Sequence, residues 1–341
     1  MKEDIKSRLL VTGGAGFIGS NFIHYILGEH PEWTITNLDS LTYAGNLENL
    51  KDIENDPRYK FVKGDITNRE LVNQLVGQGI DVIVNFAAES HVDRSIMDAS
   101  PFIRTNIEGT QVLLEAAREY SIKLFLQVST DEVYGSLGST GKFSEETSLA
   151  PNSPYSACKA SADLLCRAYY HTHGLPIKIT RCSNNYGPYQ FPEKLIPLLV
   201  TNALENKEIP VYGDGMNVRD WIHTEDHCRA LDFVIQHGKV GEAYNVGSDN
   251  EQTNLDLVKA ILDIMGKSHD LIKFVTDRAG HDLRYAIDNT KIESETGWKP
   301  RISFEEGLKN TVNWYVQNES WWRRIKSGEY ADYYQQMYSQ R

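Results

Sequence analysis

A glycine-rich segment near the start of the chain restricts the fold more than any other feature. Residues 12–20 read Thr-Gly-Gly-Ala-Gly-Phe-Ile-Gly-Ser and satisfy GxGxxG from Gly14 and GxxGxxG from Gly13. The segment lies between a β-rich run and a run of helical period. In that context glycines permit a tight turn and let backbone N–H groups and the helix N-terminus approach a pyrophosphate. The sequence therefore predicts a dinucleotide-binding unit at this turn.

Up to Arg181, short β-rich runs alternate with longer helical runs. The expected strands are Leu9–Val11, Thr34–Leu38, Tyr59–Lys63, Asp81–Phe86, Lys123–Ser129 and Ile177–Thr180. The expected helices are Phe17–Leu27, Arg69–Val76, Phe102–Tyr120, Tyr155–His173, Lys194–Asn206, Thr224–His237 and Asn254–Met265. Such alternation predicts an α/β fold with a Rossmann-type, doubly wound parallel sheet.

After Arg181 the alternation loosens into turn-rich stretches between helices. We therefore expect residues 1–181 to form an NAD-binding Rossmann domain, to which the chain returns near 224–247. Residues 182–341 are expected to form mainly a smaller, C-terminal substrate-binding lobe.

Composition limits the classes of ligand and partner. The 341-residue chain has a formal net charge of −12, which argues against an extended nucleic-acid surface, so an anionic ligand must meet a local basic pocket. No apolar run reaches membrane-spanning length. The four cysteines, Cys158, Cys166, Cys182 and Cys228, form no CxxC pair and no zinc-type spacing, which predicts reduced, buried thiols and no metal site. We expect a cytoplasmic protein without a signal peptide.

Acidic and small residues follow three of the expected strands. Asp39 ends the second strand twenty residues after Gly19, where a carboxylate would accept hydrogen bonds from an adenosine ribose and repel a 2′-phosphate. NAD is therefore favoured over NADP. Asp65-Ile66 and Phe86-Ala87-Ala88 occupy further carboxyl ends of strands, where ligands of open α/β sheets bind.

Two further motifs carry acid–base chemistry. Tyr155 and Lys159 form a YxxxK pair that shares one helix face, with Ser153 and Pro154 suited to the cap and first turn. An ammonium beside a phenol favours the phenolate, so Tyr155 could remove a proton from a sugar hydroxyl. Alone, this pair would fit a solvated helix face equally well.

The second motif, Ser129-Thr130-Asp131-Glu132, follows the fifth strand. Thr130 could hydrogen-bond a substrate oxygen. Adjacent strand residues point to opposite faces, so Asp131 and Glu132 can serve one sugar only if the chain has already left strand geometry. Two carboxylates with different pKa values could then act as acid (Asp131) and base (Glu132). A solvent-facing acidic pair is the alternative.

Taken together, these motifs resemble the extended short-chain dehydrogenase/reductases, and among them the dTDP-glucose 4,6-dehydratase family. The resemblance runs nearly end to end. It rests on TGGAGFIGS, LDSLTYAGNLENL, FAAESHVDRS, STDEVYG, YSACK, NNYGPYQFPEKLIP, VYGDGMNVRDWIH and RAGHDLRYAID. Cys158, inside the YxxxK spacer, stands where many relatives carry serine.

The resemblance extends the set of site residues. The expected catalytic residues are Thr130, Asp131, Glu132, Tyr155 and Lys159. With the glycines and strand ends included, the expected NAD-binding residues are Gly13, Gly16, Phe17, Ile18, Gly19, Asp39, Ser40, Leu41, Thr42, Asp65, Ile66, Phe86, Ala87, Ala88, Thr105, Tyr155, Lys159 and Asn185. The expected substrate-binding residues are Ser90, Thr130, Asn184, Lys194, Leu195, Pro210, Tyr212, Arg219, Asn254, Arg278 and His281. Lys194 and Arg219 would supply the positive charge for a diphosphate.

The implied activity is removal of water from a nucleotide-linked hexose to give a 4-keto-6-deoxy sugar, with dTDP as the nucleotide on resemblance alone. A 4-epimerase would leave the Asp-Glu pair unexplained, and a uronate decarboxylase typically lacks the Asp. A GDP-mannose dehydratase usually lacks that Asp as well and has an NADP-type second strand. A non-catalytic NAD-binding protein usually lacks the Tyr or the Lys. The expected helices 102–120 and 155–173 carry more apolar surface than one contact with the sheet requires, which predicts a homodimer. We expect neither nucleic-acid nor membrane partners.

Overall fold

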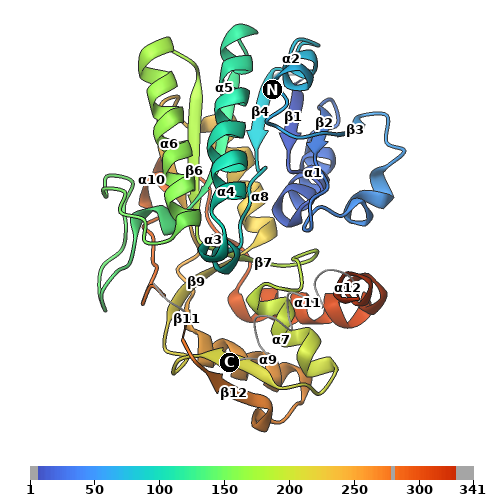
Figure 1. Cartoon of the computed structure of the whole chain (residues 1–341), viewed down its shortest axis with the longest axis vertical. Helices are drawn as coiled ribbons and strands as arrows, with labels where there is room; N and C mark the ends of the chain where they lie inside the picture. Colours follow the sequence, from blue (N-terminus) through green and yellow to red (C-terminus); the bar gives the residue numbers. More distant parts are fainter. Residues whose placement is uncertain (1–6, 278–280, 328–341) are drawn as a thin grey trace.

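The computed structural model describes residues 7–277 and 281–327. Its centre is a seven-stranded parallel sheet in the order β10-β6-β5-β4-β1-β2-β3 (Figure 1). Its strands are β1 (Arg8–Thr12), β2 (Thr34–Asp39), β3 (Tyr59–Lys63), β4 (Val82–Asn85), β5 (Leu124–Thr130), β6 (Ile177–Cys182) and β10 (Ala243–Val246). The strand order reverses between β1 and β4, which is where open α/β sheets bind ligands. The predicted Rossmann-type sheet is confirmed.

Helices cover both faces of this sheet because successive strand residues alternate between them. Leu9 and Val11 of β1 pack into the cluster under α1 and α8, whereas Leu10 packs under α2 and α5. The helices of this part are α1 (Phe17–Glu29), α2 (Arg69–Val76), α3 (Val92–Met97), α4 (Ser100–Phe102), α5 (Thr110–Glu119), α6 (Pro154–His173), α8 (Thr224–His237) and α10 (Thr290–Thr296), with a 3₁₀ segment, η1 (Leu47–Ile53).

A second, smaller body of structure lies below the carboxyl ends of the strands (Figure 1). Its strands are β7 (Asn184–Tyr186), β8 (Ile209–Tyr212), β9 (Val218–His223), β11 (Glu251–Thr253) and β12 (Ile272–Val275), paired as β11-β9-β7 and β12-β8. Its helices are α7 (Leu195–Leu204), α9 (Asn254–Met265), η4 (His269–Leu271), α11 (Phe304–Gln317) and α12 (Glu319–Lys326). The core of this part includes Trp321, Trp322 and Tyr315, all buried.

The segment 224–246 returns from this smaller part to the large sheet. Helix α8 packs against α1, and β10 pairs in parallel with β6. The division at residue 181 remains a prediction, but the chain crosses between the two bodies more than once. The cavity described below lies where these crossings meet.

One predicted helix is wrong in detail. The segment 102–120 was expected to be one regular helix, but residues Ile103–Gly109 form a π-helical segment, η2, between α4 and α5. The widened turn carries Asn106, whose side-chain amide hydrogen-bonds both backbone groups of Glu89 at 2.9 and 3.0 Å. Such π-helical segments occur frequently at functional sites.

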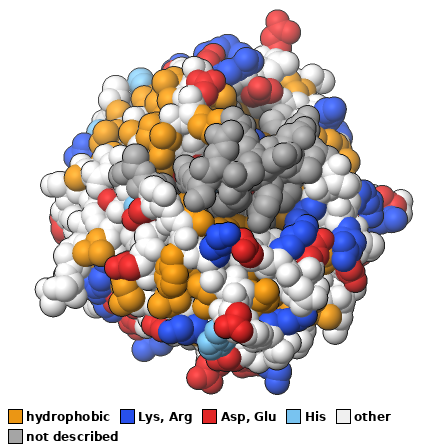
Figure 2. Space-filling view, turned by 60° about the horizontal axis from the view of Figure 1, so that its bottom comes forward, with side chains coloured by type: hydrophobic (Ala, Val, Ile, Leu, Met, Phe, Trp, Pro, Cys, Tyr) orange, Lys and Arg blue, Asp and Glu red, His pale blue; other side chains and the backbone are white. Residues whose placement is uncertain are grey.

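On the face of the molecule that Figure 2 shows, acidic and basic side chains are interspersed rather than segregated. No helix within the described residues is long and apolar enough to cross a membrane. The four cysteines are free and buried, as predicted.

Candidate active site

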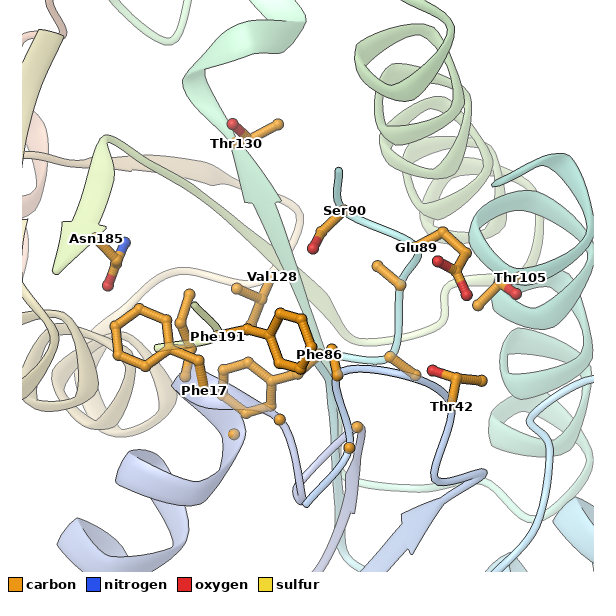
Figure 3. Close-up of a pocket in the computed structure, with 18 of the residues that line it drawn as sticks. Phe17, Thr42, Phe86, Glu89, Ser90, Thr105, Val128, Thr130, Asn185 and Phe191 are labelled. Carbon is orange, nitrogen blue, oxygen red and sulfur yellow. The ribbon is translucent and has the colours of Figure 1, made fainter. Parts of the chain in front are cut away.

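A cavity of about 390 Å³ opens at the carboxyl edge of the large sheet. Its walls come from the glycine turn, the ends of β2, β4, β5 and β6, the π-helical segment, and the segment from β7 to α7. Figure 3 shows the rings of Phe17, Phe86 and Phe191 gathered in it, with Thr42 and Thr105 to one side. Thr130 lies at the end of β5. The walls of the cavity are thus both aromatic and polar.

The glycine turn fits a dinucleotide on steric grounds. Gly13 has a φ of +69°, and a Cβ there would lie 2.7 Å from the backbone nitrogen of Ala87. A Cβ on Gly19 would lie 2.4 Å from the carbonyl oxygen of Gly13. The cap residue Gly16 offers the first turn of α1 no side-chain hydrogen bond. The helix therefore directs backbone amides at the cavity, as a pyrophosphate requires.

Asp39 lies at the end of β2, beside the glycine turn. Its carboxylate is buried and accepts hydrogen bonds from the backbone nitrogens of Ala15 at 2.9 Å and Leu41 at 2.8 Å. Burial raises the pKa of Asp39 despite these two bonds. The carboxylate is therefore held rigidly at the end of β2, as the sequence predicts for a group that meets a ribose.

The segment after β5 brings three reactive side chains together. The chain leaves strand geometry at Asp131, where the 3₁₀ turn η3 (Asp131–Tyr134) begins, as the sequence argument required. The Thr130 hydroxyl donates to Asp131 Oδ1 at 3.3 Å and accepts from the Glu132 backbone nitrogen at 3.3 Å. Asp131 is 2% exposed, and its Oδ2 has no hydrogen-bond partner among the described residues.

The environment of Asp131 favours its protonated form. Burial, followed by the charges of Glu132 and Asp220, raises its pKa well above the ordinary value, while Arg219 and the Thr130 hydroxyl oppose that rise. Glu132, by contrast, lines the cavity. The two neighbouring carboxyl groups thus occupy different environments, which is the condition for one to act as an acid and the other as a base.

Tyr155 and Lys159 approach the same place from α6. The predicted cap is confirmed, because Ser153 and Ser156 form a capping box and Pro154 is the first helical residue. Burial and the charge of Glu132 raise the pKa of Tyr155, and burial lowers the pKa of Lys159.

The Lys159 ammonium forms its hydrogen bond with the backbone rather than with the Tyr155 phenol that the sequence suggests. Its ammonium donates to the Val128 carbonyl at 2.6 Å, and the hydrogen bond that lowers the pKa of Tyr155 comes from Thr130.

Asn185 is fixed by a buried histidine. His227, on α8, meets the Asn185 side-chain oxygen through Nδ1 at 2.8 Å. Burial lowers the pKa of His227 to about 3, so the ring is neutral and Nδ1 carries the hydrogen that it donates. The Asn185 amide nitrogen donates to the Ser183 carbonyl at 3.0 Å. Asn185 is thereby presented to the cavity in one orientation.

A second group of residues lies beside the cavity, in the smaller body. Arg219 donates to the carbonyls of Val218 and Asp282 at 2.8 and 3.0 Å, and its guanidinium lies 4.4 Å from the centroid of the Tyr285 ring. Tyr212 and His281 have ring centroids 6.2 Å apart. Arg219 therefore places a positive charge close to Asp131.

Comparison with known proteins identifies the family. A family model described as GDP-mannose 4,6 dehydratase matches residues 10–311. The dTDP-glucose 4,6-dehydratase of Streptomyces niveus is 52% identical over 95% of this chain and 97% of its own length. The chain belongs to the dTDP-glucose 4,6-dehydratase family.

Solved structures show how widely the scaffold of this family is shared. A dTDP-glucose 4,6-dehydratase from Streptomyces venezuelae, crystallised with NAD and TYD bound, has a TM-score of 0.91 and 52% identity, covering 94% of this chain and 100% of its own. A UDP-glucose 4-epimerase from Thermotoga maritima still reaches a TM-score of 0.86 at 29% identity, with 92% and 99% coverage. Side chains in the cavity, rather than the fold, therefore distinguish dehydratase from epimerase.

Most of the predicted site residues line the cavity. They are Gly13, Gly16, Phe17, Ile18, Gly19, Asp39, Ser40, Thr42, Asp65, Ile66, Phe86, Ala87, Ala88, Ser90, Thr105, Thr130, Glu132, Tyr155, Lys159, Asn184, Asn185, Lys194 and Leu195. Leu41, Asp131, Pro210, Tyr212, Arg219, Asn254 and His281 are not among its lining residues. Arg278 lies outside the described residues.

The sequence argument missed a cluster that closes one wall of the cavity. The Arg94 guanidinium donates twice to Glu193 Oε2, at 3.2 and 3.0 Å, and lies 4.1 Å from the centroid of the Tyr43 ring. Phe191 packs edge-on against Tyr43. These residues lie within the segments that carry the family resemblance, but only the fold brings the three segments together.

The buried imidazole of His227 makes folding stability depend on pH. An unfolded histidine takes up a proton near pH 6.5, whereas the folded His227 does so only near pH 3. Below pH 6.5 the unfolded state therefore gains protons that the folded state lacks, so stability falls as the pH falls. We expect His227→Gln to reduce this slope, measured by urea unfolding, by an amount that rises from about 0.7 kcal/mol per pH unit at pH 6.5 to about 1.4 near pH 5. An unchanged slope would contradict the neutral, buried ring.

Proposed function

We propose that this protein converts dTDP-glucose into dTDP-4-keto-6-deoxyglucose and water, with a tightly held NAD. One observation carries the proposal: Asp131 and Glu132 leave the end of β5 together, in different environments, beside Tyr155 and the dinucleotide-shaped cavity. A 4-epimerase needs only the redox step at C4 and would have no use for an acid and a base such as Asp131 and Glu132. Sequence relatives named dTDP-glucose 4,6-dehydratase support the same substrate.

The NAD site would combine the glycine turn, Asp39 and the carboxyl ends of the neighbouring strands. When bound, NAD supplies the redox chemistry by taking two electrons from C4 and returning them to C6 within one turnover. The buried Asp39 carboxylate favours NAD over NADP, because a 2′-phosphate there would meet a fixed negative charge. The wall formed by Tyr43, Arg94 and Glu193 closes one side of the cavity and would help to retain the cofactor between turnovers.

Tyr155 would remove the proton of the C4 hydroxyl. In the ligand-free cavity, burial and neighbouring carboxylates raise its pKa, which opposes this role. The Thr130 hydrogen bond, the ammonium of Lys159 one helical turn away, and the positive charge of oxidised nicotinamide all favour the phenolate. Cofactor binding is therefore expected to prepare Tyr155 as a base.

Asp131 and Glu132 would carry out the elimination. Oxidation at C4 makes the proton at C5 acidic, and Glu132, which lines the cavity, is the base that removes it. Asp131 is kept protonated by its surroundings and would donate to the departing C6 hydroxyl. Glu132 would then return a proton to C5 as C6 is reduced.

The diphosphate would bind between the cavity and the smaller body. Lys194, whose ammonium donates to the Ser90 carbonyl at 2.8 Å, already lines the cavity. Arg219 would reach the diphosphate by exchanging its backbone carbonyl partners for phosphate oxygens. Tyr212, Asn254 and His281 surround the same region and would complete the nucleotide end of the substrate site.

A homodimer is part of the proposal. Along α6, Ala157, Leu164 and Ala168 lie on one exposed face, and Leu164 is 56% exposed. Ile103, at the start of the neighbouring π-helical segment, is 52% exposed. Exposed apolar side chains on adjacent helices suit a helix–helix contact with a second copy. The four free thiols agree with a reducing, cytoplasmic setting.

The activity has a direct test. Purified protein incubated with dTDP-glucose in deuterated water should give a 4-keto-6-deoxy sugar deuterated at C5, because the proton on Glu132 exchanges with solvent before it returns. NMR of the sugar measures both features. Recovery of unchanged glucose, or of a galactose epimer, would refute the dehydratase proposal.

The division of labour between the carboxyl groups is tested by Glu132→Gln. Without its base, the variant should lose C5 exchange and product formation by about 10²-fold or more, while C4 oxidation continues. The absorbance of the reduced cofactor would then accumulate after substrate is added. Loss of cofactor reduction in this variant would instead assign Glu132 to the first step.

The dimer surface is tested by Leu164→Arg. A charge in the centre of the apolar contact should shift the protein from dimer to monomer in light scattering, because an unpaired charge is costly to bury. Val316→Arg is the matched control, since Val316 on α11 is also exposed, at 46%, but lies elsewhere. A wild-type protein that is monomeric at all concentrations would refute this part of the proposal.

A further inference from the structure

The wall formed by Tyr43, Arg94 and Glu193 separates the active-site cavity from a second cavity of about 290 Å³. Tyr43 and Phe191 line both cavities, whereas Glu193 lines the first and Arg94 lines the second. The rings of Tyr43 and Phe191 meet edge-on, with their centroids 5.5 Å apart. Space therefore lies directly behind the two rings, and a change of side-chain rotamer would move them into it.

One ion pair spans this wall from one cavity to the other. The Arg94 guanidinium donates to Glu193 Oε2 through Nε at 3.2 Å and through Nη2 at 3.0 Å. The same guanidinium lies 4.1 Å from the centroid of the Tyr43 ring and so covers one face of it. The Glu193 side chain is 1% exposed, so separating the pair would leave a buried carboxylate without its arginine. The pair therefore favours the closed wall.

The backbone on both sides of the wall is anchored. The segment before α7 is held by the Tyr315 hydroxyl, which donates to the Gln190 carbonyl at 2.6 Å. Helix α3, which carries the arginine, is held to α6 because the Tyr155 backbone nitrogen donates to Ser95 Oγ at 3.2 Å. An opening of the wall is therefore a movement of side chains rather than of the elements that carry them.

The turn that carries Tyr43 is packed against Asp39. The Leu41 backbone nitrogen donates to Asp39 Oδ1 at 2.8 Å, and the Gly45 nitrogen closes the turn by donating to the Thr42 carbonyl at 3.0 Å. A Cβ on Gly45 would lie 2.9 Å from Asp39 Oδ1, so the turn lies as close to the carboxylate as a backbone can. The Tyr43 ring is thus placed by the residue that would meet the ribose of the cofactor.

The proposed reaction requires that the reduced cofactor stay in the site. The two electrons taken from C4 return to C6 only later in the same turnover, after water has left. If the site opened in between, NADH would be released and the sugar would remain oxidised by two electrons. A closed site is therefore a condition for completing the reaction and not only for binding.

We propose that Arg94 is a positioning residue that holds the wall shut as a gate over the reduced cofactor. The gate opens when Arg94 and Glu193 separate and the rings of Tyr43 and Phe191 turn into the second cavity, and NAD is exchanged only then. No covalent bond changes in this step. The role rests on the proposed dehydratase activity and deepens it, because it names the side chains that prevent loss of the cofactor in mid-reaction.

The gate is tested first without substrate, by comparing Arg94→Gln with wild type. Each protein is loaded with NAD and desalted, and the NAD that stays bound is followed over time by chromatography. We expect the dissociation rate constant of Arg94→Gln to rise by at least about 10-fold, because two charge-assisted hydrogen bonds no longer hold the wall. Arg58→Gln is the matched control. Arg58 is also 29% exposed and pairs with Asp56 at 2.7 Å, but it lines neither cavity, so this variant should lose NAD at the wild-type rate.

A trap for free NADH gives the readout that a merely structural role would not change. Lactate dehydrogenase with pyruvate consumes only NADH that has left the protein. With dTDP-glucose, Arg94→Gln should therefore form lactate and give less 4-keto-6-deoxy sugar per sugar consumed, whereas wild type and Arg58→Gln should form no lactate. If Arg94→Gln releases NAD no faster than wild type and yields no lactate, the gate is refuted.

Tyr43→Ala tests the same gate without changing the ion pair. Removal of the ring that lies between the two cavities should also raise the rate of NAD loss by at least about 10-fold. If Arg94→Gln fails to fold, this variant decides, and NAD loss at the wild-type rate would refute the gate. If wild type retains NAD but makes no 4-keto-6-deoxy sugar, the proposed function fails instead. The two failures are therefore distinguishable.

Discussion

At the end of β1, three stretches of backbone approach so closely that no side chain fits between them. Gly13 lies against Ala87 after β4, and Gly19 in α1 lies against the carbonyl of Gly13. Only this approach lets α1 start directly behind the strand and leave its first amides facing the gap between β1 and β4. Every other part of the site is placed relative to that gap, because the parallel strands deliver their carboxyl ends to one edge.

The reactive groups at this edge have their proton affinities set chiefly by burial. Desolvation is the largest cause of the raised pKa of Asp131, the raised pKa of Tyr155 and the lowered pKa of Lys159. Each neutral form is favoured when the cavity is empty. A bound dinucleotide and sugar bring charge into the same volume, so binding changes which groups hold protons. Such coupling makes the protons of Tyr155 and Asp131 properties of the pair rather than of single residues.

The sequence predicts those parts of the fold that depend on local chemistry. The glycine turn, Asp39 at a strand end and the cap of α6 each follow from residue types at fixed spacing, and each lies where expected. The π-helical segment was not predictable, because its widened turn is accompanied by a contact between Asn106 and Glu89 that only the folded chain shows. The partner of Lys159 was likewise set by where β5 lies behind α6.

The wall made by Tyr43, Arg94 and Glu193 shows the same limit at the level of the site. No pattern in the sequence relates a loop after β2, a short helix after β4 and the segment before α7, since only tertiary packing joins them. The fold sets a second limit on prediction. A UDP-glucose 4-epimerase shares it at 29% identity, so the fold alone does not identify the reaction. In the mechanism that we propose, two adjacent residues, Asp131 and Glu132, distinguish the reactions. The 3₁₀ turn that follows Thr130 frees both from the alternation of a strand, and their environments differ because Asp131 is buried whereas Glu132 lines the cavity.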